Sequence, residues 1–241
     1  MVPAVPSDQT MRDAAWMRRV PGFILFLFVA DGGLVLAYAA DWALGGQSAR
    51  VTTLLDPKGT SNLVAWYASM QLFLLACLLA SFARDKLDWR TKRSWLLPLL
   101  PVVVVALSFE QIADLHKWYI LRSGGLLSRG IVHELLTVLA LAALAATAGS
   151  CLRPYVRGHR HIGATYVLSM ILLGVAGIGV RWAVVWLPPQ PGVRLLAVCG
   201  EALGELVSVT LMLWATHELL RAHRVSPLGA SIPHLRGDPP T

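Results

Sequence analysis

The stretch Val102–Trp118, VVVVALSFEQIADLHKW, joins an apolar run to side chains that could do chemistry. Glu110, Asp114 and His116 follow the valines within about two turns of a helix. Carboxylate and imidazole groups at such spacing could bind a metal ion, transfer a proton or form an ion pair. An ionisable side chain inside a membrane costs about 2.5–3.5 kcal/mol on insertion scales, so such residues usually face the interior of a helix bundle and serve a function.

Other ionisable residues interrupt apolar runs elsewhere in the chain. Counting depth along each predicted span, at about 1.5 Å per residue, puts most of them in the outer half of the bilayer and Asp31 near its middle. The predicted intramembrane polar cluster consists of Asp31, Glu110, His133, Glu134, Arg181, Glu201 and Glu205. Two interpretations stay open: an ion-pair network that only stabilises the bundle, and a site for a ligand, a proton or a metal ion.

The segment CGEALGELVS carries two stripes of one predicted helix. Small residues at every fourth position let another helix approach closely. That helix-packing stripe consists of Gly200, Gly204 and Ser208. Glu201 and Glu205 form a second stripe about 100° around the helix, and they repel each other unless one is protonated or paired. Arg181 is the only basic residue well inside a predicted span, so we predict that it pairs with Glu201 or Glu110.

Neither a metal centre nor a catalytic group is predicted from these residues, and the cofactor is left open. Glu110, His116 and His133 are the side chains that could act as metal ligands. However, neither histidine has the E-x-x-H spacing of di-iron bundles or belongs to an H-E-x-x-H motif. The three cysteines, Cys77, Cys151 and Cys199, show no C-x-x-C spacing and are expected to be free thiols.

The composition indicates a protein that crosses a membrane several times. Of the 241 residues, 56% are hydrophobic and 15% are charged, whereas typical globular domains have about 25% charged residues. One crossing needs about 20 predominantly apolar residues. The sequence predicts an all-α fold, a polytopic six-helix transmembrane bundle, in residues 20–220. Its spans are Val20–Ala40, Asn62–Ala83, Trp95–Trp118, Gly130–Ser150, Gly163–Leu187 and Val193–Leu220.

Lysine and arginine residues set the expected orientation of the spans. Fourteen of them fall on the side of the two termini and six on the opposite side, so both termini are expected in the cytoplasm. Residues 1–19 are expected to form an N-terminal tail with a short amphipathic helix, and residues 221–241 a disordered basic tail. The net charge of +7 is attributed to these loops and to contacts with lipid, not to nucleic acid. An alternative for the first span is a signal peptide cleaved at Ala37-Tyr38-Ala39.

The segment SFEQIADLHKW resembles a signature, roughly S-L-D-E-x5-H-E, of uncharacterised bacterial multi-span membrane proteins. Glu110 and His116 match its glutamate and histidine, whereas Phe109 replaces the aspartate and Lys117 the final glutamate. The glutamate pair of the last span is similar to carboxylates in the last span of those proteins. The resemblance implies no defined activity, and the two replacements remove carboxylates, which puts any metal site of such relatives in doubt here.

In size, six-span layout and Ala/Arg-rich composition, the chain also resembles the myxobacterial membrane-bound anti-sigma factor of light-induced carotenoid synthesis. That resemblance implies a protein that holds a cytoplasmic sigma factor until a light or singlet-oxygen signal releases it. The first expectation is therefore a signal-sensing regulator of transcription in the bacterial inner membrane, with lipid and a cytoplasmic protein as partners. Two other classes stay open: an intramembrane metal-, haem- or quinone-dependent oxidoreductase or lipid-modifying enzyme, and a small transporter.

Overall fold

The computed structural model describes six stretches of the chain, and within them the fold is helical. The stretches are residues 20–46, 49–57, 62–88, 95–113, 129–180 and 190–225. The elements are α2 (Gly22–Ala43), α3 (Ala49–Leu55), α4 (Leu63–Lys86), α5 (Leu99–Ala113), α7 (Arg129–Val156), α8 (Arg160–Gly174), the π-helix η2 (Val175–Gly179) and α10 (Pro191–Ala222). These stretches contain no strand, so the all-α class is confirmed for them. The two predicted tails, apart from residues 221–225, lie outside the described residues.

Four helices of the described chain are long and apolar enough to cross a membrane. They are α2, α4, the continuous α8–η2 segment Arg160–Gly179 and α10, with 22, 24, 20 and 32 residues. α5 is a shorter apolar helix of 15 residues. The six-span count and the cytoplasmic position of both termini stay predictions.

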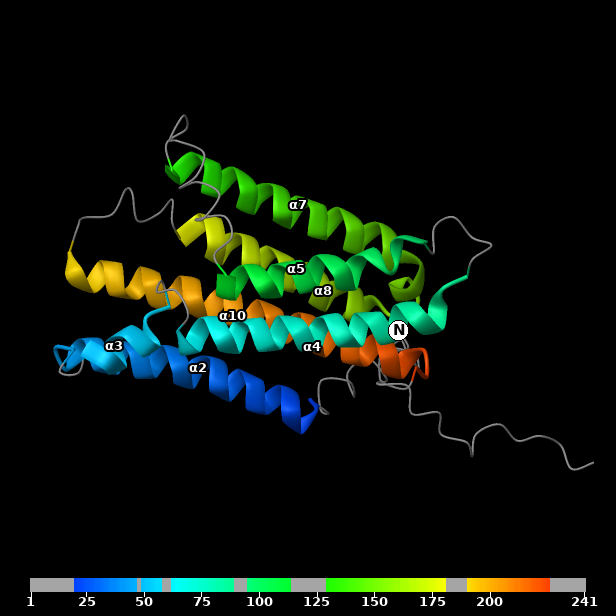
Figure 1. Ribbon diagram of the computed structural model, residues 1–241. Coiled ribbons are helices and arrows are strands. Elements are labelled where there is room, and N and C mark those ends of the chain that lie inside the picture. The colour runs from blue at the N-terminus through cyan, green and yellow to red at the C-terminus, as the bar shows by residue number, and fades with distance from the viewer. Residues whose placement is uncertain are drawn as a thin grey trace, which may run out of the picture.

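The long helices lie side by side along one common direction, as Figure 1 shows. α10 is the most widely connected of them, because it packs against α2, α4 and the α8–η2 segment. α4 also packs against α5, and α7 lies on α8 and α5. α10 therefore contacts both α2 and α4. Hydrogen bonds from α4 to α2 complete the place where the three helices meet, which positions the polar site described below.

The ends of several helices follow from local sequence. The Asn62 side chain caps α4 by accepting a hydrogen bond from the backbone N–H of Ala65 at 2.7 Å. α5 begins at Leu99, so Pro101 falls in its first turn, where the missing N–H of proline breaks no helical hydrogen bond. α10 ends with Arg224 in the left-handed region (φ 54°), while the Val225 N–H reaches back to the Leu220 carbonyl at 2.9 Å.

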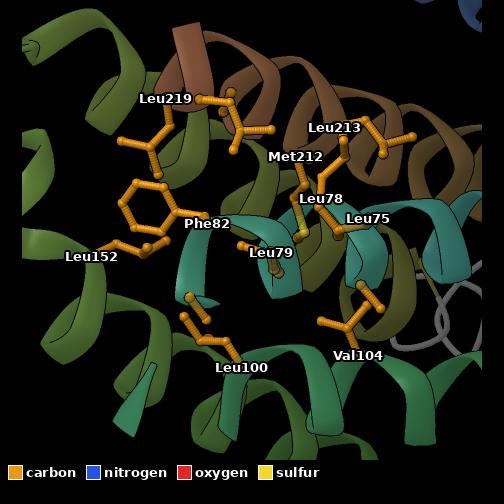
Figure 2. Close-up of a cluster of buried hydrophobic side chains, with 14 of the residues drawn as sticks. Leu75, Leu78, Leu79, Phe82, Leu100, Val104, Leu152, Met212, Leu213 and Leu219 are labelled. Atoms are coloured by element: carbon orange, nitrogen blue, oxygen red, sulfur yellow. The ribbon is translucent and has the colours of Figure 1, made fainter. Parts of the chain in front are cut away.

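A large apolar core fills the bundle on the side where α4 and α10 end. Its largest fully buried side chains include Phe82 of α4 and Leu213 and Leu219 of α10. Figure 2 shows how side chains from α4, α5, α7 and α10 interdigitate there. The side chains labelled in that view are Leu75, Leu78, Leu79, Phe82, Leu100, Val104, Leu152, Met212, Leu213 and Leu219. This packing fixes α4 against α10 and thereby sets the register of the two helices.

Several helix boundaries differ from those expected from the sequence. A short helix, α3, follows α2 where a loop was expected, and the Thr52 hydroxyl in it donates to Asp41 Oδ2 at 2.7 Å. α7 continues past the expected end at Ser150 to Val156 with Pro154 inside it. In the fifth expected span the α-helix changes to a π-helix over Val175–Gly179, a segment with two glycines.

The helix-packing stripe of α10 makes its close approach at one position. A Cβ built on Gly204 would lie 2.5 Å from the Cβ of Ala176 in η2, which is closer than two carbon atoms can pack. A Cβ on Gly200 would meet no atom within 4 Å, and Ser208 is fully buried. Gly204 therefore permits the crossing of α10 and η2, because any larger residue would push the two helices apart.

We expect Gly204→Ala to destabilise the protein by about 1–3 kcal/mol, because the added methyl group overpacks the contact with Ala176. Gly200→Ala is the matched control on the same helix and is expected to be neutral or to stabilise by up to about 1 kcal/mol. The measurement is the free energy of unfolding in mixed detergent micelles. Equal stability of the two variants would contradict the close approach.

Candidate functional site

Asp31 lies in the middle of α2 and is completely buried. Its carboxylate accepts three hydrogen bonds from the two neighbouring helices. On α4, Tyr67 Oη and Gln71 Nε2 both donate to Asp31 Oδ1 at 2.9 Å. On α10, Thr210 Oγ1 donates to Asp31 Oδ2 at 2.8 Å. These four residues, called the Asp31 network below, tie α2, α4 and α10 together at one depth of the bundle.

The donors of the Asp31 network are almost fully used. The two hydroxyl groups and the amide carry four hydrogens, and three of them point to the carboxylate. The fourth goes from Gln71 to the oxygen of Tyr67 or Thr210, each 3.0 Å away. Gln71 Oε1 is buried and has no hydrogen-bond partner among the described residues. The network therefore keeps one unused acceptor at its centre.

Asp31 is held by neutral donors. Within the described stretches no lysine, arginine or histidine lies within ion-pair distance of its carboxylate, and Tyr67, Gln71 and Thr210 are its polar contacts. A carboxylate buried without a paired cation loses much of its solvation, which charge-assisted hydrogen bonds only partly replace. The stability of the Asp31 network is therefore more sensitive to the charge state of Asp31 than that of an ion pair, in which a cation would balance the carboxylate.

Apolar side chains cover the Asp31 network on both sides along the length of the bundle. On one side lie Val35, Val64, Ala202 and Leu206, from the same three helices. The other side is the large core of Figure 2, to which α2, α4 and α10 all contribute. Hydrogen bonds in such a water-poor environment are stronger than in water, and a lost partner is correspondingly costly. Any change of charge at Asp31 must therefore be accommodated by the three helices themselves.

The other predicted cluster residues lie at different places. Glu201 is buried and Glu205 is half-buried, with Glu205 Oε1 3.7 Å from a Cβ built on Gly177 of η2. Glu201 precedes Thr210 by nine residues, so it lies about 14 Å nearer the start of α10 than the Asp31 network. Glu110 is half-buried on α5. None of these three glutamates is among the hydrogen-bond partners of Asp31 in the described chain.

The remaining predicted site residues cannot be placed around the network. His133 and Glu134 belong to α7, but their side chains are not described. Arg181, Asp114 and His116 lie outside the described residues, and so does the predicted pairing of Arg181 with Glu201 or Glu110. Within the described stretches, no three His, Cys, Asp or Glu side chains are grouped so that they could hold a metal ion.

Three members of the Asp31 network were missed by sequence reasoning: Tyr67, Gln71 and Thr210. Tyr67 and Gln71 are four residues apart, so they lie on one face of α4, and a glutamine in the middle of an apolar span was the available signal. Thr210 gave no signal, because a threonine can satisfy its hydroxyl within its own helix. Only the packing of α10 against α2 shows that this hydroxyl turns to Asp31.

Two further buried hydroxyl contacts join neighbouring helices. Ser69 of α4 and Ser108 of α5 lie 2.8 Å apart through their Oγ atoms. Tyr166 Oη of α8 and Thr216 Oγ1 of α10 lie 2.6 Å apart. Both contacts are separate from the Asp31 network, and Thr216 lies on the same helix as Thr210. Thr216 therefore offers a matched control for substitutions at Thr210.

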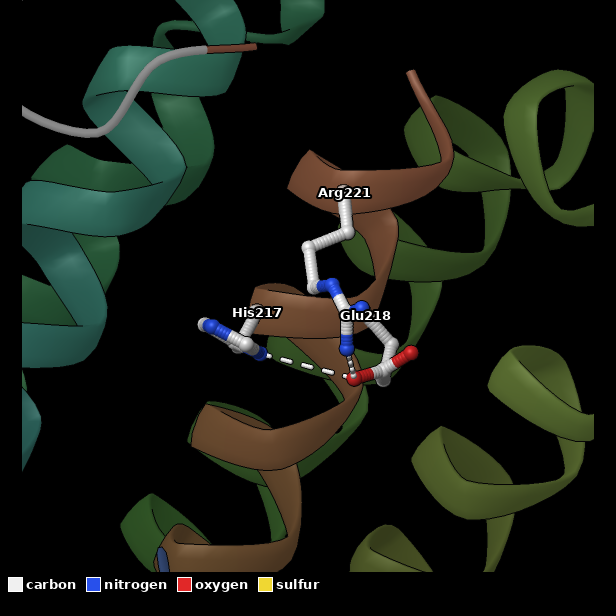
Figure 3. Close-up of polar contacts among 3 residues, drawn as sticks. All are labelled: His217, Glu218 and Arg221. Atoms are coloured by element: carbon white, nitrogen blue, oxygen red, sulfur yellow. Dashed lines mark hydrogen bonds and ion pairs between the residues drawn. The ribbon is translucent and has the colours of Figure 1, made fainter. Parts of the chain in front are cut away.

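The far end of α10 carries a second polar group, shown in Figure 3. Glu218 Oε1 lies 3.3 Å from a guanidinium nitrogen of Arg221 and 3.5 Å from His217 Nδ1. One turn on, His223 Nε2 lies 3.1 Å from the Tyr155 carbonyl of α7. Exposed arginines from four helix ends surround this region: Arg84, Arg153, Arg157, Arg160, Arg221 and Arg224. We call this the arginine-rich end of the bundle.

Substitutions at Asp31 test the network. Asp31→Leu leaves three buried donors without their acceptor, each worth about 1–3 kcal/mol, and we expect a net loss of about 2–4 kcal/mol in the free energy of unfolding. Asp31→Asn keeps the size and one acceptor oxygen, so its loss is expected to be about 1 kcal/mol. The measurement is unfolding by titration with denaturing detergent. A leucine variant as stable as the original chain would contradict a stabilising network.

Comparisons of the chain with protein-family models, with curated proteins and with solved structures find no match. The two resemblances stated from the sequence therefore stay predictions. The role of the chain is inferred from its own residues, above all from the buried carboxylate of Asp31 and its three donors.

Proposed function

We propose that the chain is a signal-sensing regulatory protein of the bacterial inner membrane, which holds a soluble cytoplasmic partner and releases it on a signal. In this proposal α5 and α7 also cross the bilayer, which gives six spans with both termini in the cytoplasm. α7, with 28 residues, is about 42 Å long and sufficient for a crossing. The observation that carries the proposal is the carboxylate of Asp31, buried where three helices meet and without a paired cation among the described residues.

A buried carboxylate of this kind suits a switch between two arrangements of the helices. Ionisable residues inside membrane spans usually have a function. In the part of the chain that the structure describes, the donors to Asp31 are all neutral. When the carboxylate gains a proton, or a donor is withdrawn, at least one hydrogen bond must change direction. Because the donors belong to α4 and α10, such a change alters the preferred packing of three helices at once. A signal that acts on Asp31 thereby biases two arrangements of the bundle.

α10 supplies the route from the Asp31 network to the arginine-rich end. It is one continuous helix, and Glu218 lies eight residues, or about 12 Å, beyond Thr210. Between them Met212, Leu213 and Ala215 are buried in the bundle. A shift of α10 at Thr210 is therefore transmitted to the group of Figure 3 through a packed segment. The exposed arginines there fit a partner with an acidic surface.

The test compares two threonine variants of α10. Thr210→Val removes a donor to Asp31, whereas Thr216→Val removes the contact to Tyr166 with the same change of side chain and equal burial. We expect Thr210→Val to change the amount of co-purifying partner by at least about fivefold and Thr216→Val to leave it unchanged. The measurement is quantitative mass spectrometry of the full-length protein purified from its native host in mild detergent.

Three results would contradict the proposal. One is equal loss of partner in both variants, which would make stability the cause. Another is the absence of any stoichiometric soluble protein from the purified original chain. The third is a stoichiometric metal ion or a haem absorption band in the same preparation, which would favour an intramembrane oxidoreductase.

A further inference from the structure

A small pocket of about 240 Å³ opens where α2 ends and α10 begins. Its lining residues are Tyr38, Trp42, Pro191, Arg194, Leu195 and Val198. Arg194 opens α10 and Thr210 lies more than four turns further along it, so the pocket is well separated from the Asp31 network. Neither the arginine-rich end nor the network uses these residues.

The pocket has the composition of a membrane–water interface. Tyrosine and tryptophan gather at that depth because their rings are apolar and their edges polar, and arginine extends its charge to the headgroups. Trp42 is 42% exposed, and it occupies the last turn of an apolar helix that is long enough to cross the bilayer. A ligand in this pocket would therefore meet lipid headgroups on one side and acyl chains on the other.

Charge is distributed unevenly around the pocket. Arg194 lies in the first turn of α10, where the helix dipole adds positive potential. On the α2 side, Asp41 follows Tyr38 by three residues and therefore lies one turn from this lining residue on the same helix. Asp41 is fixed there by the hydroxyl of Thr52 in α3. Arg194 thus lines the pocket from α10, and the carboxylate of Asp41 lies one helical turn from the lining residue Tyr38 of α2, which suits a ligand with both charges.

We propose that this pocket binds the headgroup of a phospholipid with a primary amine, namely phosphatidylethanolamine. The phosphate lies at the guanidinium of Arg194, which is suited to phosphate oxygens. The ammonium group lies toward the rings of Tyr38 and Trp42 and the carboxylate of Asp41.

The size of the pocket fits this assignment. Pockets for whole drug-sized ligands measure about 300–1,000 Å³, so 240 Å³ suits a headgroup better than a complete molecule. The acyl chains then lie outside the pocket, along exposed apolar side chains of the two helices. Leu36 of α2 and Leu196 of α10, which are 71% and 73% exposed, provide such surfaces.

Native mass spectrometry of the full-length protein tests the proposal. The protein is released from detergent after incubation with equal amounts of phosphatidylethanolamine and phosphatidylglycerol, which share the phosphate but not the amine. We expect the original chain to retain phosphatidylethanolamine in preference. Arg194→Gln is expected to lower this retention about tenfold, the effect of one lost charge-assisted hydrogen bond. Arg194→Lys should restore most of it.

Two further variants distinguish recognition of the headgroup in the pocket from a general attraction of lipids to charged residues. Asp41→Asn is expected to lower the retention of phosphatidylethanolamine and to leave that of phosphatidylglycerol unchanged. Arg160→Gln removes an exposed arginine at the first residue of α8, away from the pocket, and is expected to change neither. Equal retention of the two lipids, or equal loss in Arg160→Gln and Arg194→Gln, would overturn the proposal. Retention of glycerophosphoethanolamine, which has no acyl chains, as strong as that of phosphatidylethanolamine would identify a soluble ligand instead of a lipid and would also overturn it.

Discussion

The arrangement of α2, α4 and α10 depends on the need to satisfy one buried carboxylate. Asp31 is completely buried, and its three donors come from two other helices. Apolar packing alone would allow α2 to rotate or slide, because one apolar face can replace another at little cost. The hydrogen bonds permit only one register, since a shift of one residue would leave donors and carboxylate unpaired in an apolar environment. In the proposed mechanism, this contact is also the place where a change of charge selects a second arrangement.

Close packing on another face of α10 complements this polar constraint. At Gly204 the helix approaches η2 so closely that no side chain fits between them. The π-helix there displaces the backbone relative to an α-helix of the same length, and such segments often occur at functional sites. Glu205, the next residue, has a carboxylate oxygen 3.7 Å from a Cβ built on Gly177 in that segment. α10 is therefore held by hydrogen bonds on the side of α2 and α4 and by steric contact on the side of η2.

Much of the helical fold could be predicted from the sequence, but the polar site could be predicted only in part. Runs of about 20 apolar residues are a strong signal, and α2, α4, the α8–η2 segment and α10 all arise from them. Asp31 was also visible, because an aspartate in an apolar run is rare. Its partners were not, because side chains such as Thr210 are ordinary in a span and become donors only through tertiary packing. Counting depth along each span grouped residues by height in the membrane, but it gave no information on which helix faces meet. The α3 helix and the π-helix were missed because neither produces a hydrophobic period of its own.

The two ends of α10 meet different chemistry, and this favours a division of roles along one helix. The first turn lies beside aromatic rings and Arg194 in a pocket that suits a lipid headgroup. The last turns lie among exposed arginines and the Glu218 group that suit a soluble partner. Between the two ends, Thr210 links α10 to the charge of Asp31. Any tilt or rotation of α10 that disturbs the hydrogen bond from Thr210 must also move both ends, because a continuous helix with a buried middle transmits displacement with little bending. Lipid at one end and partner at the other would thus be coupled through the same carboxylate, and the sign of that coupling would depend on which arrangement the ionised form of Asp31 stabilises.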